Sequence, residues 1–182
     1  MIMSTLKEIC DGLLAAKGLQ PRDGKTFCNV AVRRAALNFG YTGFHADAMA
    51  NEMVANMRNY GDFDKVDGDI AATRAAEGRL VIAGLQFVQC AEAHDKRCQV
   101  SECPYYKDTR EPMAPVDCEG RIVQMVKLAH GHVSVVYPAP MQRSGSWNKM
   151  VPMLANIGKT NGLMRTSQAF PVEPDYFVLK AN

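Results

Sequence analysis

The sequence predicts an α+β fold in which N-terminal helices pack on a mainly antiparallel sheet. Apolar residues at helical spacing dominate the chain up to residue 78, whereas runs rich in Val, Ile and Leu dominate the rest. The two kinds of segment do not alternate strictly, which argues against a parallel sheet. The length of 182 residues fits one domain, so we expect a single domain over 1–182 with a cysteine-rich insertion at about 89–120.

Two helices are expected before residue 41. Apolar residues recur at helical spacing from Leu6 to Leu14, and Gly18 closes this first helix. After a loop that contains Pro21, the run TFCNVAVRRAALNF forms the second helix, which ends at Gly40 in the position of a C-cap. Cys28 therefore lies in the first turn of the second helix.

A third helix is expected from about His45 to Tyr60, and a short alanine-rich helix over 69–78. In the third helix, Met49, Met53 and Met57 recur at every fourth position. A methionine stripe of this kind is typical of a core, and the alternative is that it lines a substrate groove.

The strands are expected where β-branched and aromatic residues gather. These runs lie at 79–88, in two parts of 121–138 joined near Gly131, and at 151–158, 164–170 and 175–180. The polar segment between the first two of these runs contains three prolines and separates the run at 79–88 from the later strands.

Charge and hydropathy exclude two classes of partner. The chain has 21 Lys and Arg against 19 Asp and Glu, and no run of like charges marks a nucleic-acid binder. No segment approaches the roughly 20 apolar residues that a membrane span needs. The opening MIMSTLKEICDGLLAAKG has acidic residues and no small-residue cleavage site, so we expect an amphipathic helix rather than a signal peptide.

Four of the six cysteines lie in or beside the insertion: Cys90, Cys98, Cys103 and Cys118. With His94 they would suffice for a tetrahedral zinc site, but their spacing matches no zinc motif. Disulfides and free thiols are equally compatible with this pattern. We therefore expect no metal site and no cofactor.

Cys28, His132 and Asn156 are the candidate catalytic residues. A thiol at a helix N-terminus lies beside unpaired N–H groups that favour the nucleophilic thiolate, although free cysteines are commonly buried structural residues. His132 follows Gly131 at the head of the strand HVSVVYP, a rigid place for a general base, and His130 is its rival.

Asn156 lies within an apolar strand, where its amide must find a hydrogen-bond partner. That partner is either local backbone or an imidazole that the amide orients. Asn161, in a turn-like stretch, is the alternative orienting residue.

The cysteine in TFCNVAVRRAAL, the strand start GHVSVVYP and the following asparagine-bearing strand resemble the cysteine, histidine-dependent amidohydrolase/peptidase (CHAP) group and NlpC-like cell-wall peptidases. The resemblance covers residues 26–170 and departs from the compact family members at the insertion, which precedes the histidine strand. It implies a reduced papain-like fold with Cys28 as nucleophile, His132 as base and acid, and Asn156 as orienting residue. Gln20, in the loop before Cys28, would then be a candidate oxyanion donor.

The function that this resemblance implies is hydrolysis of an amide bond in bacterial cell-wall peptides through a thioester. It also implies a peptidoglycan peptide as substrate, an immunity or inhibitor protein as a possible partner, and delivery to the wall by phage lysis or a secretion machine. The alternatives are a protein-directed cysteine peptidase or transglutaminase on the same scaffold, and a metal-binding interaction module in which the three residues are structural.

Overall fold

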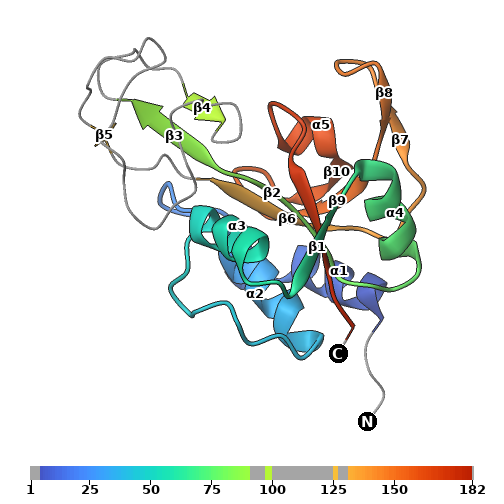
Figure 1. Cartoon of the computed structure of the whole chain (residues 1–182), viewed down its shortest axis with the longest axis horizontal. Helices are drawn as coiled ribbons and strands as arrows, with labels where there is room; N and C mark the ends of the chain where they lie inside the picture. The colour runs from blue at the N-terminus through green and yellow to red at the C-terminus, as the bar shows by residue number, and fades with distance from the viewer. Residues whose placement is uncertain (1–4, 91–96, 100–124, 127–130, 182) are drawn as a thin grey trace.

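A six-stranded antiparallel sheet forms the centre of the molecule. The computed structural model describes residues 5–90, 97–99, 125–126 and 131–181 (Figure 1). The strand order is β1-β11-β2-β6-β9-β10, and each neighbouring pair is antiparallel. The strands are β1 (Phe63–Val66), β11 (Asp175–Leu179), β2 (Val81–Leu85), β6 (His132–Val136), β9 (Met153–Asn156) and β10 (Gly162–Arg165). The expected α+β class and mainly antiparallel sheet are therefore confirmed.

The helices pack against this sheet. They are α1 (Leu6–Ala15), α2 (Cys28–Asn38), α3 (Ala50–Asn59), α4 (Gly68–Ala76) and α5 (Thr166–Ala169), with a 3-10 turn η1 (Lys17–Leu19) after α1. Figure 1 shows α2 and α3 side by side on one side of the central strands, and α2 contacts β6 while α3 contacts both β2 and β6. The helix that carries Cys28 is thereby fixed against the strand that carries His132.

Small residues allow α2 to approach the sheet closely. Ala31, Ala35 and Ala36 are almost completely buried, and Val32 between them is 1% exposed. The facing strand residues Val133 and Val135 are equally buried. Burial of such apolar surface contributes roughly 25 cal/mol per Å², so this contact holds α2 firmly in place.

The third helix begins five residues later than expected. Residues 45–48 form a turn in which the Ala48 N–H donates to the His45 carbonyl (3.2 Å). The Glu52 carboxylate then accepts from the Met49 N–H at 2.7 Å and fixes the helix start at Ala50. The expectation that the methionine stripe belongs to the core is confirmed for Met53 and Met57 and wrong for Met49, which is 48% exposed.

The strand expected at 164–170 is wrong for most of its length. Only its first two residues belong to β10, and Thr166–Ala169 forms the helix α5. The reason is a local cap, because Gln168 Oε1 accepts a hydrogen bond from the Arg165 backbone N–H at 3.0 Å. This turn lets Phe170 enter the core.

The run at 79–88 divides between two sheets. Its first part is β2 in the main sheet, and its end contributes to β3 (Phe87–Cys90) in a three-stranded sheet with order β4-β3-β5. The partners are β4 (Arg97–Gln99) and β5 (Met125–Val126), so β5 does not pair with β6. His94, Cys103, Cys118 and His130 lie outside the described residues, as do the side chains of Cys90 and Cys98.

Candidate active site

Cys28 is the first residue of α2. The helix begins without a side-chain cap at Phe27 among the described residues, so its first N–H groups stay available. The backbone N–H groups of Val133, Asn29 and Cys28 itself act on the thiol and lower its pKa. Because Val133 follows His132 in the chain, the structure brings Cys28 to the head of the histidine strand.

His132 and Asn156 are joined by a hydrogen bond. His132 begins β6 and Asn156 ends β9, and the two strands pair antiparallel with Val135 opposite Ala155. Carrying that register one residue further along β9 places Asn156 on the same face of the sheet as His132. His132 Nε2 and Asn156 Oδ1 are 2.7 Å apart. The alternative in which Asn156 bonds only to local backbone is therefore wrong.

The second bond of Asn156 fixes which ring nitrogen of His132 carries the proton. Asn156 Nδ2 donates to the Thr160 carbonyl at 2.8 Å, so the amide oxygen must be the atom that faces the imidazole. An amide oxygen only accepts, and the neutral ring of His132 therefore carries its proton on Nε2. Its Nδ1 is left with a free electron pair, as a general base requires.

Two residues that sequence reasoning missed shape the pocket around the imidazole. The ring of Phe170, which is 2% exposed, packs on the ring of His132 with centroids 4.9 Å apart. Gly158 lies on another side, where an added Cβ would come within 3.0 Å of His132 Cε1 and 3.4 Å of Asn156 Nδ2. Neither residue has a sequence signal for this role, because both contacts depend on how β9 and α5 fold back on β6.

The secondary candidates differ in position. Asn161 accepts from the Gly158 N–H at 3.0 Å and donates to the Leu19 carbonyl at 2.9 Å, so it organises a turn rather than orienting His132. Gln20, the residue after Leu19, is exposed and lies on the segment that this bond ties to the turn. The rival base His130 lies outside the described residues.

Burial controls the charge of both candidate reacting groups. It raises the pKa of the Cys28 thiol, and the surrounding backbone N–H groups lower it by less. Burial also lowers the pKa of His132, with a smaller opposing effect of the bond to Asn156. Burial therefore opposes the effect of the helix N-terminus on the Cys28 thiol, and the pKa of each group moves toward its neutral form.

The raised pKa of Cys28 predicts slow alkylation of this residue at neutral pH. Iodoacetamide reacts with thiolates, so the labelling rate should rise as the pH passes above about 8.5, the ordinary pKa of cysteine. Cys10, which is fully buried and has its pKa raised to about 12, should stay unlabelled in the same sample. Peptide mapping by mass spectrometry measures both sites, and complete labelling of Cys28 already at pH 6 would contradict a raised pKa of this thiol.

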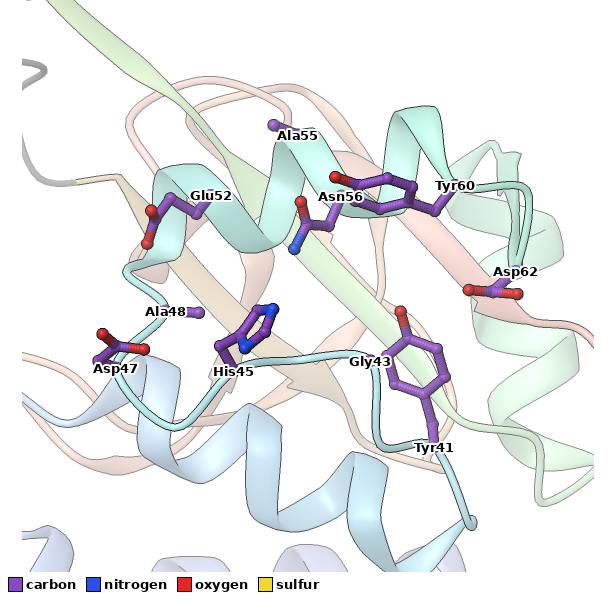
Figure 2. A pocket seen from close by; sticks show the side chains of 10 residues that line it. All are labelled: Tyr41, Gly43, His45, Asp47, Ala48, Glu52, Ala55, Asn56, Tyr60 and Asp62. Carbon is purple, nitrogen blue, oxygen red and sulfur yellow. The ribbon is translucent and has the colours of Figure 1, made fainter.

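A pocket of about 680 Å³ lies between α3 and the preceding loop (Figure 2). Figure 2 shows Tyr41, Tyr60 and Asp62 toward one end of it, and Asp47 and Glu52 toward the other. Ala48 also lines the pocket. Its carbonyl accepts a hydrogen bond from the side chain of Asn29, the residue after Cys28, at 2.9 Å. The pocket therefore begins close to the N-terminus of α2.

The part of the chain that the structure describes contains no cluster of three or more side chains able to hold a metal ion. In the same residues, no helix is long and apolar enough to cross a membrane. The chain matches no protein-family model and no curated protein. The case for a function therefore depends on the geometry of Cys28, His132 and Asn156.

Proposed function

We propose that this chain is a papain-like cysteine hydrolase that cleaves an amide bond in bacterial cell-wall peptides. The observation that carries the proposal is the 2.7 Å contact of His132 Nε2 with Asn156 Oδ1, at the head of the strand whose Val133 N–H acts on the Cys28 thiol. It leaves Nδ1 as the basic atom of the imidazole. The sequence resemblance to CHAP and NlpC-like peptidases supplies the substrate class.

The mechanism is acyl transfer. His132 Nδ1 takes the thiol proton as Cys28 Sγ attacks the amide carbon, which turns the neutral pair into an ion pair only during reaction. The imidazolium then gives this proton to the leaving amine, and a thioester remains on Cys28. Water, deprotonated by Nδ1, attacks the thioester, and collapse of the second tetrahedral intermediate releases the acid and restores the thiol.

The charge on the tetrahedral oxygen requires hydrogen-bond donors. The uncapped start of α2 offers the Cys28 N–H, and its macrodipole favours negative charge at this place. Gln20 is the second candidate donor, because the bond from Asn161 to the Leu19 carbonyl holds its segment beside the turn that borders His132. Its exposed side chain is free to turn toward a bound substrate.

Phe170 has a separate role in this proposal. Its ring covers the imidazole and keeps water from competing for the His132–Asn156 hydrogen bond. A hydrogen bond in such a dry surrounding is stronger than one exposed to water, so the orientation of the imidazole is maintained during turnover.

Digestion of purified peptidoglycan tests the proposal. Wild-type protein should release new amine and carboxyl termini in the stem peptides, which mass spectrometry locates, and Cys28→Ser protein should release none. Casein with a glutamine and amine donor, assayed in parallel, reports protein cleavage or transglutamination. Activity on casein alone would move the substrate to proteins, and cleavage of wall peptides by the serine variant at the wild-type rate would refute the mechanism.

A further inference from the structure

A chain of buried polar contacts joins β11 to the first turn of α3. Asp175 Oδ2 accepts from Arg58 Nε at 3.1 Å and from Arg58 Nη2 at 2.5 Å. Arg58 Nη1 donates to Gln86 Oε1 at 2.6 Å, and Gln86 Nε2 donates to the Asn51 backbone carbonyl at 2.7 Å. We call these four residues, Asp175, Arg58, Gln86 and Asn51, the Arg58 bridge.

Most of the Arg58 bridge is shielded from water. Gln86 is 4% exposed and Asn51 is 6% exposed, while the side chains of Arg58 and Asp175 retain 17% and 14%. An ion pair that has lost its hydration adds little net stability, because desolvation offsets most of the attraction between the charges. Its directional hydrogen bonds nevertheless fix the distance between the elements that they join.

Two parts of the Arg58 bridge border the backbone just before His132. Gln86 follows Leu85, and Leu85 is the cross-strand partner of His132. On the other side, Gly131 precedes His132, and a Cβ added there would lie 2.1 Å from Asn51 Oδ1 and 2.7 Å from the Leu85 carbonyl. The side chain of Asn51 and the end of β2 therefore enclose Gly131, and only glycine fits between them.

We propose that Arg58 and Gln86 are positioning residues that set the place of His132 through Asn51 and Gly131. The Gln86 Nε2 group holds the first turn of α3 against the end of β2. Arg58 in turn holds the Gln86 side chain by donating to its Oε1 atom. With this bridge intact, the strand head that carries His132 has one position relative to Cys28. The catalytic meaning of this positioning depends on the proposed function, whereas the positioning itself can be measured without substrate.

The test replaces Gln86 by Leu, which keeps the size of the side chain and removes both hydrogen bonds. We expect the His132 ring resonances to move in NMR spectra, kcat to fall about tenfold and KM to change little, because misplacing a catalytic group impairs chemistry more than binding. Gln86→Glu retains the acceptor for Arg58 but sets a carboxylate oxygen against the Asn51 carbonyl, so it should move the same resonances. If the Gln86→Leu protein does not fold, the His132 resonances and kcat of the Gln86→Glu protein decide whether Gln86 positions His132.

Tyr137→Phe is the matched control. It removes one partly buried hydrogen bond, to Asp11 at 2.8 Å, just beyond the opposite end of β6, and should leave the His132 resonances and kcat at wild-type values. A Gln86 variant that only lowers the thermal midpoint, with His132 resonances and kcat unchanged, would overturn the proposal. If wild-type protein cleaves no amide but the His132 resonances still move in the Gln86 variants, the proposed function fails, whereas the positioning of His132 by Gln86 is supported.

Discussion

Replacing Cys28 with Ser should abolish amide cleavage while the protein stays folded. Loss of the nucleophile in a triad costs on the order of 10⁶-fold in kcat, because the other members act only through it. The serine hydroxyl occupies nearly the same volume and can accept from the same N–H groups that surround the thiol, so the thermal midpoint should change little. Product analysis by mass spectrometry and a thermal melt measure the two effects.

His132→Ala is the companion variant. It removes the general base, for which a loss of about 10²–10⁴-fold in rate is usual. Normal cleavage by this variant would transfer the role of base to another residue, and His130→Ala would then be the next variant to measure.

Asn156→Ala should lower both the rate of amide cleavage and the free energy of unfolding. The alanine leaves the His132 Nε2 proton and the Thr160 carbonyl without their partner in a site where Asn156 is 4% exposed. Unpaired buried polar groups cost about 1–3 kcal/mol each, so the free energy of unfolding should fall by a few kcal/mol. The rate should fall less than with His132→Ala, because the base is still present.

Asn156→Asp distinguishes the hydrogen bond to His132 from the hydrogen bond to Thr160, because it keeps only the first. Aspartate still accepts from Nε2 and, as a charge, raises the pKa of His132, but it cannot donate to the Thr160 carbonyl. We expect activity between wild type and Asn156→Ala, with the acid limb of the pH profile moved to higher pH. Asn161→Ala, which breaks two bonds without touching His132, should retain more activity than Asn156→Ala, and the reverse order would contradict the assigned orienting role.

The elements that sequence could predict are those whose pattern is local. The apolar spacing from Leu6 to Leu14 predicts α1, and the β-branched runs predict β2, β6 and β9. Strand β1 has one buried residue, Phe63, and exists because it pairs with β11 more than one hundred positions later, as Phe63 with Leu179 shows. The hairpin of β7 (Gln142–Ser144) and β8 (Lys149–Val151) likewise has no alternating apolar pattern.

In the candidate site, too, some residues can be predicted from local sequence and others depend on the whole fold. Cys28, His132 and Asn156 are recognisable from residue type and place in an element, and the structure places Asn156 against His132. Phe170 and Gly158 are not recognisable, because their contacts with His132 arise from turns that the sequence pattern does not predict. The charge state of the thiol also depends on burial, a property of the whole fold, which outweighs the local helix end.

Trapping the thioester tests whether the reaction passes through an acyl group on Cys28. Wild-type protein is mixed with soluble wall peptides, quenched in acid during turnover, digested and analysed by mass spectrometry. We expect an acyl fragment of the substrate bonded to the peptide that contains Cys28, and no such adduct in Cys28→Ser or His132→Ala protein. Turnover with no adduct on Cys28, or with the fragment on another residue, would contradict acyl transfer through this cysteine.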